Sequence, residues 1–210
     1  MSTYKKKLIE VALPLEAINE ASRKEKGPFT KNHPRALHVW WARRPLAACR
    51  AVLFASLVDD PSSRPDLYPS EAEQDTQRQK LFSLLEKLVR WESTGNSDLL
   101  ARVRTVIEES TGTPTPTIYD PFCGGGSIPV EAQRLGLRAI GTDLNPVAVL
   151  ITKGLIELPP LCVKHPAINP ATRAQRRKML LTAPLEGLFE DLRYYGSWIK
   201  ARTEERVGWV

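Results

Sequence analysis

A glycine-rich turn near the middle of the chain carries the residue types best suited to hold a ligand. Three consecutive glycines, Gly124 to Gly126, follow a short apolar run and precede a helical pattern. Without Cβ atoms they can take positive φ angles and let a ligand reach main-chain N–H groups. Ser127 is a good N-cap for the helix, and Pro129 suits its first turn. A turn at a helix N-terminus favours an anionic group, either a phosphate or a carboxylate.

Two aspartates flank this glycine turn. Asp120 ends the predicted strand before it, and Asp143 ends a second predicted strand that starts at Arg138. Because a strand, a helix and a strand are joined by a right-handed crossover, the two strands are expected to be parallel neighbours. Both carboxylates then lie at the carboxyl edge of the sheet, which is where open α/β sheets bind their ligands.

The charges at this edge discriminate between two nucleotide-like ligands. Asp143 follows Gly124 by 19 residues, close to the spacing at which dinucleotide-binding folds use an acid to hold ribose hydroxyls, so NAD is one candidate. Pro129, however, stands where that pattern has its third glycine, and Asp120 would repel a phosphate. S-adenosylmethionine presents an ammonium group for Asp120, a carboxylate for the N–H groups and a ribose for Asp143. It therefore fits the charges better than NAD.

A second unusual stretch, His33 to Leu46, crowds two His, two Trp and three Arg into 14 residues. This Trp-Arg segment directly precedes an apolar helical repeat that follows Pro45. Two interpretations remain open. Trp40 and Trp41 could be packing anchors, with Arg43 and Arg44 capping carboxylates or solvated. Alternatively, the indole and guanidinium groups could line a pocket for a flat, charged ligand such as an adenosyl group.

These stretches resemble the motifs of known enzymes. Asp120-Pro-Phe-Cys-Gly-Gly-Gly-Ser127 resembles the cofactor motif of DNA amino-methyltransferases, and Gly141-Thr-Asp-Leu-Asn-Pro146 resembles the acidic motif that follows it. The stretch His38 to Leu46 is similar in position to the Lys-Pro helix start that those enzymes place before the cofactor motif. Together with Asp191-Leu-Arg-Tyr-Tyr-Gly196, the chain resembles one family in particular. It is the N-terminal domain of uncharacterised function found on large proteins assigned as adenine-specific DNA methylases, some of which carry a zinc ribbon.

The resemblance implies an α/β chain with a partial Rossmann-like fold of S-adenosylmethionine-dependent methyltransferases, preceded by N-terminal helices and a helical insertion. It implies methyl transfer from S-adenosylmethionine to a base of DNA, with adenine as the target, by the full-length protein. The cofactor-binding residues that it implies come from all three motifs: His38, Trp40, Arg43, Arg44, Pro45, Asp120, Pro121, Phe122, Cys123, Gly124, Gly126, Ser127, Asp143, Leu144 and Asn145.

The catalytic motif of amino-methyltransferases is not found in the chain. That motif places Asp, Asn or Ser before Pro-Pro and an aromatic residue, so that polar groups orient the target amine while the aromatic ring stacks on the flipped base. Leu158-Pro-Pro-Leu161 has the prolines but neither the polar nor the aromatic residue. We therefore expect an N-terminal piece of a longer protein, inactive alone, whose partners are DNA and the remaining C-terminal part of the same protein. No Cys-x-x-Cys pair occurs, and no metal site is expected.

The pattern along the chain predicts four segments. Residues 1–58 form an N-terminal helical segment that completes the cofactor pocket, with a helix from about Pro14 to Lys26. Residues 59–117 form a helical insertion and linker. Residues 118–160 form the cofactor-binding strand-helix-strand-helix unit, whose last helix is capped by Asn145. Residues 161–210 hold a basic loop and a long helix, in which apolar residues from Leu185 to Ile199 recur at helical spacing and predict a core stripe.

Composition sets the broader limits. The chain has 210 residues, 42% of them apolar, and a net charge of +6, which is compatible with a nucleic-acid partner. The three cysteines are too few and too widely spaced for a disulfide framework, and no stretch resembles a membrane span or a signal peptide, so a cytoplasmic protein is expected. Two other functions stay open, an NAD-binding oxidoreductase domain and a non-catalytic module for nucleic-acid binding or complex assembly.

Overall fold

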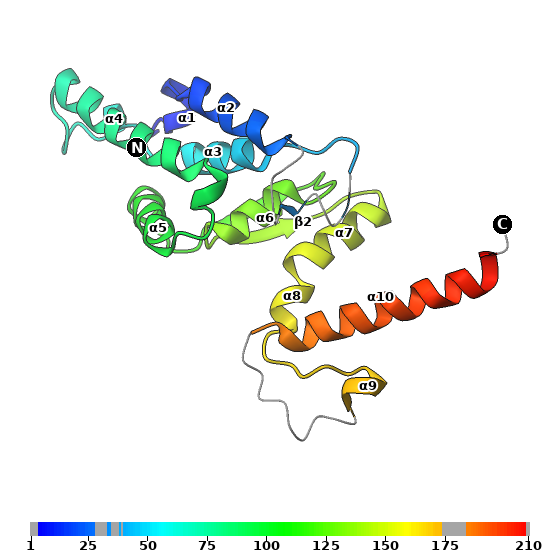
Figure 1. The fold of residues 1–210 in the computed structure, drawn as a ribbon. Coiled ribbons are helices and arrows are strands. Elements are labelled where there is room, and N and C mark those ends of the chain that lie inside the picture. Colours follow the sequence, from blue (N-terminus) through cyan, green and yellow to red (C-terminus); the bar gives the residue numbers. More distant parts are fainter. Residues whose placement is uncertain (1–3, 28–32, 35–37, 39, 174–183, 209–210) are drawn as a thin grey trace. The chain divides into compact units, whose positions relative to one another are not determined.

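The structure, a computed structural model, describes residues 4–27, 33–34, 38, 40–173 and 184–208. They form two compact units, Met1–Leu155 and Ile156–Val210. The described residues are mostly helical, with one small parallel sheet (Figure 1). No helix among them is long and apolar enough to cross a membrane.

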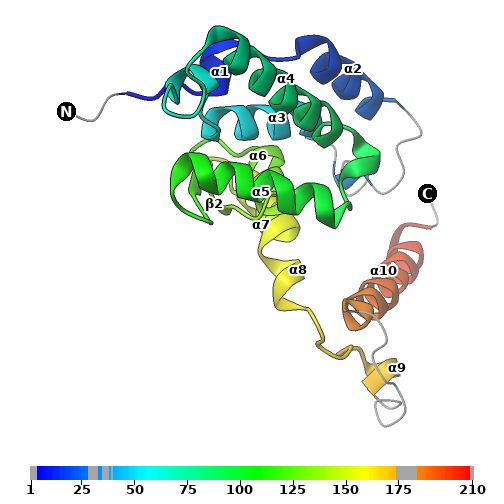
Figure 2. The ribbon, with the colours of Figure 1, turned by 90° about the vertical axis from the view of Figure 1, so that its left-hand side faces the viewer.

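The first unit begins with helices packed around one central helix, α3 (Leu46–Leu57). Its neighbours are α1 (Leu8–Val11), α2 (Leu15–Glu25), α4 (Glu71–Leu88), α5 (Ser97–Thr111) and α6 (Ser127–Arg134) (Figures 1 and 2). Two short 3-10 helices, η2 (Pro61–Ser63) and η3 (Trp91–Ser93), lie on either side of α4 in the sequence. α3 is buried on almost every side because its sequence is nearly all apolar.

The apolar faces of α4 and α5 are buried. Leu81, Leu84 and Leu88 of α4 and Leu99 and Val103 of α5 all lie in the core. Both helices also have clear sequence signals at their ends. Ser70 and Glu73 form a reciprocal capping box at the start of α4, Asn96 accepts the N–H of Leu99 at the start of α5, and Gly112 ends α5 with a φ of +71°.

The sheet consists of two parallel strands, β1 (Thr117–Asp120) and β2 (Arg138–Gly141), joined by α6. Thr117 pairs with Arg138 and Asp120 with Gly141, as the crossover rule predicts. After β2 comes α7 (Pro146–Ile156), with Asn145 Oδ1 accepting the N–H of Val147 at its start, which confirms the predicted cap.

The two faces of this sheet differ. Ile118 of β1 and Ala139 of β2 pack against the helical core. Tyr119 and Ile140, on the other face, are 60% and 41% exposed. Parallel sheets are normally covered on both faces. Among the described residues of the first unit, this second face is left largely uncovered.

The second unit contains α8 (Leu158–Leu161), α9 (Pro170–Arg173) and α10 (Glu186–Val207). Asp191 of α10 accepts the N–H groups of Ile168 and Asn169, which joins the loop before α9 to the long helix. Of the basic residues predicted in the loop, Arg173 ends α9 and the others lie outside the described residues.

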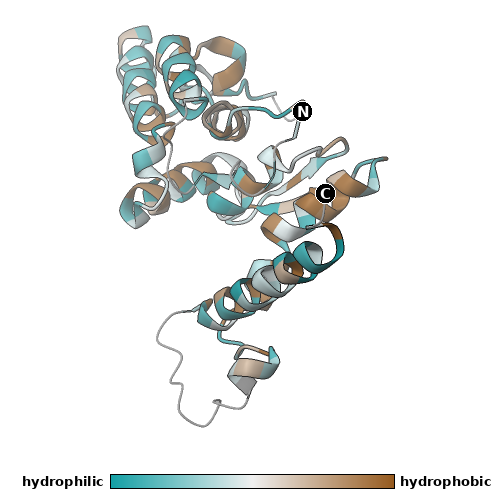
Figure 3. Ribbon diagram, turned by 45° about the vertical axis from the view of Figure 1, so that its right-hand side comes forward, coloured by the Kyte–Doolittle hydropathy of each residue, from teal (hydrophilic) through white to brown (hydrophobic). Residues whose placement is uncertain are grey.

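The predicted core stripe of α10 is wrong within the described residues. Leu192 is 62% exposed and Ile199 is 57% exposed, and Gly187 is the buried residue of this helix. Apolar and polar residues are mixed along its length (Figure 3). Helical spacing shows that apolar side chains share a face, but burial requires a partner surface, and the second unit supplies little of one.

Candidate functional site

Asp143 joins the two strand ends at the carboxyl edge of the sheet. Its Oδ2 accepts the N–H of Gly124 at 2.9 Å and its Oδ1 accepts the N–H of Asn145 at 2.9 Å. These main-chain bonds, with that of Asn145 the larger cause, hold the pKa of Asp143 below its ordinary value. The carboxylate is therefore ionised at neutral pH. Each oxygen keeps a further lone pair, so the group can also accept hydroxyl donors from a ligand.

Asp120 lies at the same edge, at the end of β1. Its Oδ1 accepts the N–H of Phe122 at 3.1 Å, which starts the turn after the strand. The turn is then fixed to β2, because the N–H of Cys123 donates to the carbonyl of Thr142 at 2.9 Å. The sequence prediction that Asp120 and Asp143 flank one loop at one edge of the sheet is thus confirmed.

The three glycines of the turn are required by close packing. A Cβ on Gly124 would lie 2.9 Å from Trp40 Nε1, and one on Gly125 would lie 2.9 Å from Trp40 Cβ. A Cβ on Gly126 would lie 2.9 Å from Thr152 Oγ1 of α7. Two of the glycine N–H groups already donate within the loop region, that of Gly124 to Asp143 and that of Gly126 to the carbonyl of Cys123. The turn therefore packs so closely against Trp40 and Thr152 that no side chain fits at these three positions.

Gly124→Ala is expected to destabilise the first unit by about 2–4 kcal/mol, because a φ of +50° strains an L-residue and the new methyl group meets the Trp40 ring. Urea unfolding measures the loss, and tryptophan emission shifts to longer wavelength if Trp40 is displaced. Gly112→Ala is the matched control, since its φ is +71° with nothing near the added methyl group. It should cost about 1–2 kcal/mol without an emission shift, and equal results for the two variants would show that Trp40 does not pack on the turn.

A cavity of about 180 Å³ lies between the Trp-Arg segment and the helices that follow each strand. The Trp-Arg segment and the start of α3 contribute one wall, and the glycine turn, α6 and α7 contribute the other. The lining residues are His33, Pro34, His38, Trp40, Arg43, Leu46, Gly125, Ser127, Val130, Ile151, Gly154 and Leu155. Arg43 Nη1 is buried and has no hydrogen-bond partner among the described residues. An unpaired guanidinium nitrogen beside a cavity suits an anionic ligand group.

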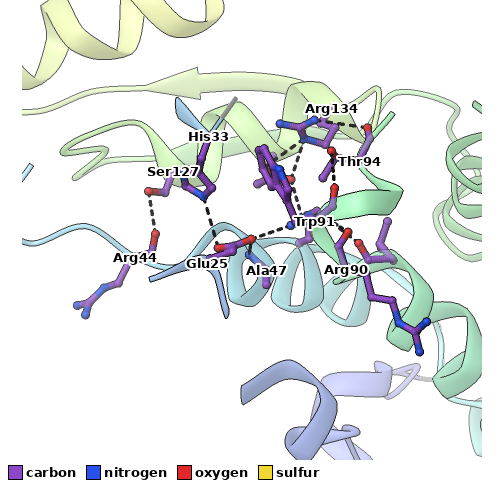
Figure 4. A network of polar contacts seen from close by, with 12 residues as sticks. Glu25, His33, Arg44, Ala47, Arg90, Trp91, Thr94, Ser127 and Arg134 are labelled. Atoms are coloured by element: carbon purple, nitrogen blue, oxygen red, sulfur yellow. Dashed lines mark hydrogen bonds and ion pairs between the residues drawn. The ribbon is translucent and has the colours of Figure 1, made fainter. Parts of the chain in front are cut away.

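Ser127 holds the two walls together. Its Oγ donates to the carbonyl of Arg44 at 3.2 Å (Figure 4). The prediction that Ser127 is the N-cap of α6 is wrong, because Gly126, with a φ of +77°, takes the cap position and Ser127 is the first helical residue. Because Gly126 can adopt the left-handed conformation at the N-cap, the Ser127 hydroxyl is not needed there and is free to donate to the carbonyl of Arg44.

The other predicted cofactor residues differ in their exposure. Phe122 and Leu144 are 77% and 96% exposed, and Pro121 is also exposed. Cys123 is buried, with its Sγ accepting from Thr152 Oγ1 at 3.4 Å. Pro45 occupies the N-cap position of α3, and Arg44 is exposed. The structure thus gathers His38, Trp40, Arg43 and Ser127 at the cavity and Asp120, Gly124, Asp143 and Asn145 at the strand ends.

A buried ion network beneath the site was not predicted. Arg50 of α3 is fully buried, and its Nη2 donates to Glu25 Oε1 at 2.9 Å while its Nε lies 3.0 Å from Glu131 Oε2. Glu25 also accepts the N–H of Ala47 at 3.0 Å, at the start of α3 (Figure 4). The signal was present in the sequence, since Arg50 is the charged residue that interrupts the apolar run from Ala47 to Val58.

The network shifts the pKa values of its two carboxyls in opposite directions. Burial opposes the charge on Glu25, but His33, 3.8 Å away, the hydrogen bond from the Ala47 N–H and the charge of Arg50 together lower the pKa of this carboxyl. Burial raises the pKa of Glu131 although Arg50 and Arg134 oppose the rise. Because Glu25 belongs to α2, Arg50 to α3 and Glu131 to α6, the network ties together the helix that starts after the glycine turn and the two helices that border the Trp-Arg segment in the chain.

No group of three or more His, Cys, Asp or Glu within the described ranges could hold a metal ion. The polar groups at the strand ends are carboxylate acceptors and main-chain N–H donors, and those at the cavity are guanidinium, imidazole and hydroxyl groups. Such a set suits an organic ligand with hydroxyls and with charges of both signs.

Comparison with known proteins gives two matches to family models. Residues 12–84 match the protein of unknown function DUF1156, and residues 94–175 match the RMKL-like methyltransferase domain. The first match contains the Trp-Arg segment, and the second contains the glycine turn, both strands and α7. Searches of curated proteins and of solved structures find no significant match. The chain therefore combines a DUF1156 domain with an RMKL-like methyltransferase domain, which confirms the family that its motifs resemble.

Proposed function

We propose that the chain binds S-adenosylmethionine at the carboxyl edge of β1 and β2 and forms the cofactor-binding part of a nucleic-acid amino-methyltransferase, with adenine in DNA as the acceptor. One observation carries the proposal. The Asp143 carboxylate accepts the Gly124 N–H, so the acid and the glycine turn form one site. This site lies wholly within the methyltransferase domain match.

The charges of the described residues fit the cofactor. Asp143 would hold the ribose hydroxyls through the lone pairs that its main-chain bonds leave available. Asp120 would accept from the ammonium group. The buried Nη1 of Arg43 would meet the carboxylate, with Trp40 excluding water from the turn. When bound, S-adenosylmethionine supplies an electrophilic methyl group on its sulfonium.

We also propose a partial Rossmann-like fold and a catalytic motif outside this chain. The strand-helix-strand-helix order, the parallel pairing and the ligand edge support a partial Rossmann-like methyltransferase fold. The stretch Leu158-Pro-Pro-Leu161, which forms α8, has no polar or aromatic group in the places that amine activation needs. We therefore assign the catalytic motif to a further part of the same protein, and DNA as the partner of the full-length protein.

NAD is the alternative ligand, and Pro129 argues against it. This proline is buried in the first turn of α6, where the dinucleotide pattern requires a glycine for close packing of the helix. Asp120 adds a negative charge where the pyrophosphate would lie.

Two titrations of the full chain separate the cofactors. Calorimetry with S-adenosylmethionine should give saturable binding, and NADH fluorescence should show none at the same concentrations. Binding of NADH in preference to S-adenosylmethionine would make the chain an oxidoreductase domain. A folded chain that binds neither would contradict the cofactor assignment and favour a non-catalytic module.

A further inference from the structure

Trp41 is the most exposed of the tryptophans that the structure describes, at 79%. Its ring stacks on that of Trp40, with centroids 4.3 Å apart and planes inclined by 20°. Trp40 is itself buried against Gly124 and Gly125. The Trp41 ring is therefore supported on one face, while most of the side chain remains open to solvent.

This exposure is not explained by the fold. Trp91 and Trp198 each have a guanidinium over the ring, Arg134 at 5.6 Å and Arg202 at 5.9 Å. The ring partner of Trp41 is another tryptophan, which leaves a flat, preorganised aromatic surface. An exposed indole adds little stability, whereas a rigid one can stack on a planar ligand at a low cost in conformational entropy.

The surroundings of Trp41 suit a nucleic acid. Arg44 follows it closely in the chain and is exposed, with its carbonyl held by Ser127 Oγ at 3.2 Å. Guanidinium groups contact phosphates, and aromatic rings stack on unpaired bases of any sequence. A base that accepts a methyl group must first leave the duplex stack, so it offers a free aromatic face to the protein.

We propose that Trp41 is a stacking platform for an unpaired nucleobase of the acceptor nucleic acid, one ring outward from the glycine turn. The proposal rests on the proposed function, because Trp40 is what connects Trp41 to the cofactor turn. The adenine of the cofactor has the same flat surface. The acceptor base is preferred because the Trp40 ring separates Trp41 from the Gly124 and Gly125 backbone.

The test uses the full chain and fluorescently labelled single strands of DNA and RNA, read by anisotropy at several salt concentrations. Trp41→Ala should bind both strands about 10-fold to 100-fold more weakly, the range expected for one lost stacking contact. Trp41→Phe should keep most of the affinity, and an abasic strand should bind wild type as weakly as an ordinary strand binds Trp41→Ala. Trp198→Ala is the matched control, an exposed tryptophan beside an arginine in the second unit, and should change nothing.

Calorimetry with S-adenosylmethionine distinguishes failure of this inference from failure of the proposed function. Unchanged cofactor affinity in Trp41→Ala, together with weaker strand binding, supports the platform. If Trp41→Ala weakens the cofactor instead, or leaves strand binding unchanged, or if wild type binds no strand, the platform assignment is wrong. If wild type binds strands through Trp41 but binds no cofactor, the platform stands and the methyltransferase proposal fails.

Discussion

Asp143→Ala is expected to weaken S-adenosylmethionine binding by about 10-fold to 150-fold, since hydrogen bonds to a charged group contribute about 1.5–3 kcal/mol. The change removes the acceptor proposed for the ribose hydroxyls and also releases the Gly124 N–H, whose bond to Oδ2 is 2.9 Å long. Both effects act on the same ligand edge. Isothermal calorimetry of the wild type and the variant measures the ratio.

Two controls make this result specific. Asp143→Asn keeps one side-chain oxygen for the Gly124 N–H but loses the charge, so its affinity should fall between those of the wild type and the alanine variant. Asp98→Ala removes an acid from the first turn of α5 and should leave the affinity unchanged. If Asp143→Ala binds S-adenosylmethionine as tightly as the wild type, the proposal that the cofactor binds at this strand edge is wrong.

The ionisation of Asp143 predicts how the affinity for S-adenosylmethionine depends on pH. Its pKa lies below the ordinary value because the charged form accepts two main-chain N–H groups, so the carboxylate protonates only at acidic pH. The contribution of this group to cofactor affinity should therefore be constant above about pH 5 and should be lost as the pH falls through its lowered pKa.

Arg50→Met should lower the free energy of unfolding of the first unit by about 3–5 kcal/mol, the typical cost of leaving a buried charge without its partner. The variant removes the Arg50 guanidinium from Glu25 and Glu131, whose side chains are 4% and 0% exposed. Urea unfolding followed by tryptophan fluorescence reports the loss, because Trp91 lies beside the network (Figure 4).

The design includes a surface control and a rescue. Arg64→Met breaks an ion pair with the exposed Asp66 and should cost about 0–1 kcal/mol. The combined variant Glu25→Gln, Arg50→Met and Glu131→Gln removes all three charges and should recover most of the stability. The amide oxygen that Glu25→Gln introduces can still accept the Ala47 N–H, which the Glu25 carboxylate accepts in the wild type.

Urea unfolding at several pH values tests whether the stability loss in Arg50→Met comes from the buried carboxylates. In Arg50→Met, Glu25 and Glu131 lose the positive charge that lowers their pKa values, so the loss of stability should shrink as the pH falls toward the ordinary carboxyl range. A loss below about 1 kcal/mol at neutral pH would show that the network is not buried in solution.

Several elements could be predicted because their causes are local. The strand, glycine turn and helix were ordered correctly around Gly124. Asn145 caps α7 as predicted, and Gly136 follows α6 with a φ of +80°. Each of these depends on a few neighbouring residues and on backbone sterics that the residue type sets.

The errors arose where a distant partner decided the outcome. Ser127 was predicted to cap its own helix, but its hydroxyl donates to a carbonyl 83 residues earlier in the chain. The α10 stripe has the correct spacing, yet its side chains are exposed because burial depends on another surface. Arg50 looked like an interruption in an apolar run, since its carboxylate partners come from other helices.

The sequence by itself determined that Asp120 and Asp143 lie at one edge of the sheet. Strand order and right-handed crossover place Asp120 and Asp143 together, because backbone chirality permits one arrangement of a strand-helix-strand unit. Only the tertiary structure decided where Trp40 of the Trp-Arg segment packs. The sequence left Trp40 open between packing and ligand contact, and the fold places it on Gly124 and Gly125, beside a cavity that Arg43 also lines. The physical reason is that side-chain packing is set by close approach in space, which local spacing along the chain does not specify.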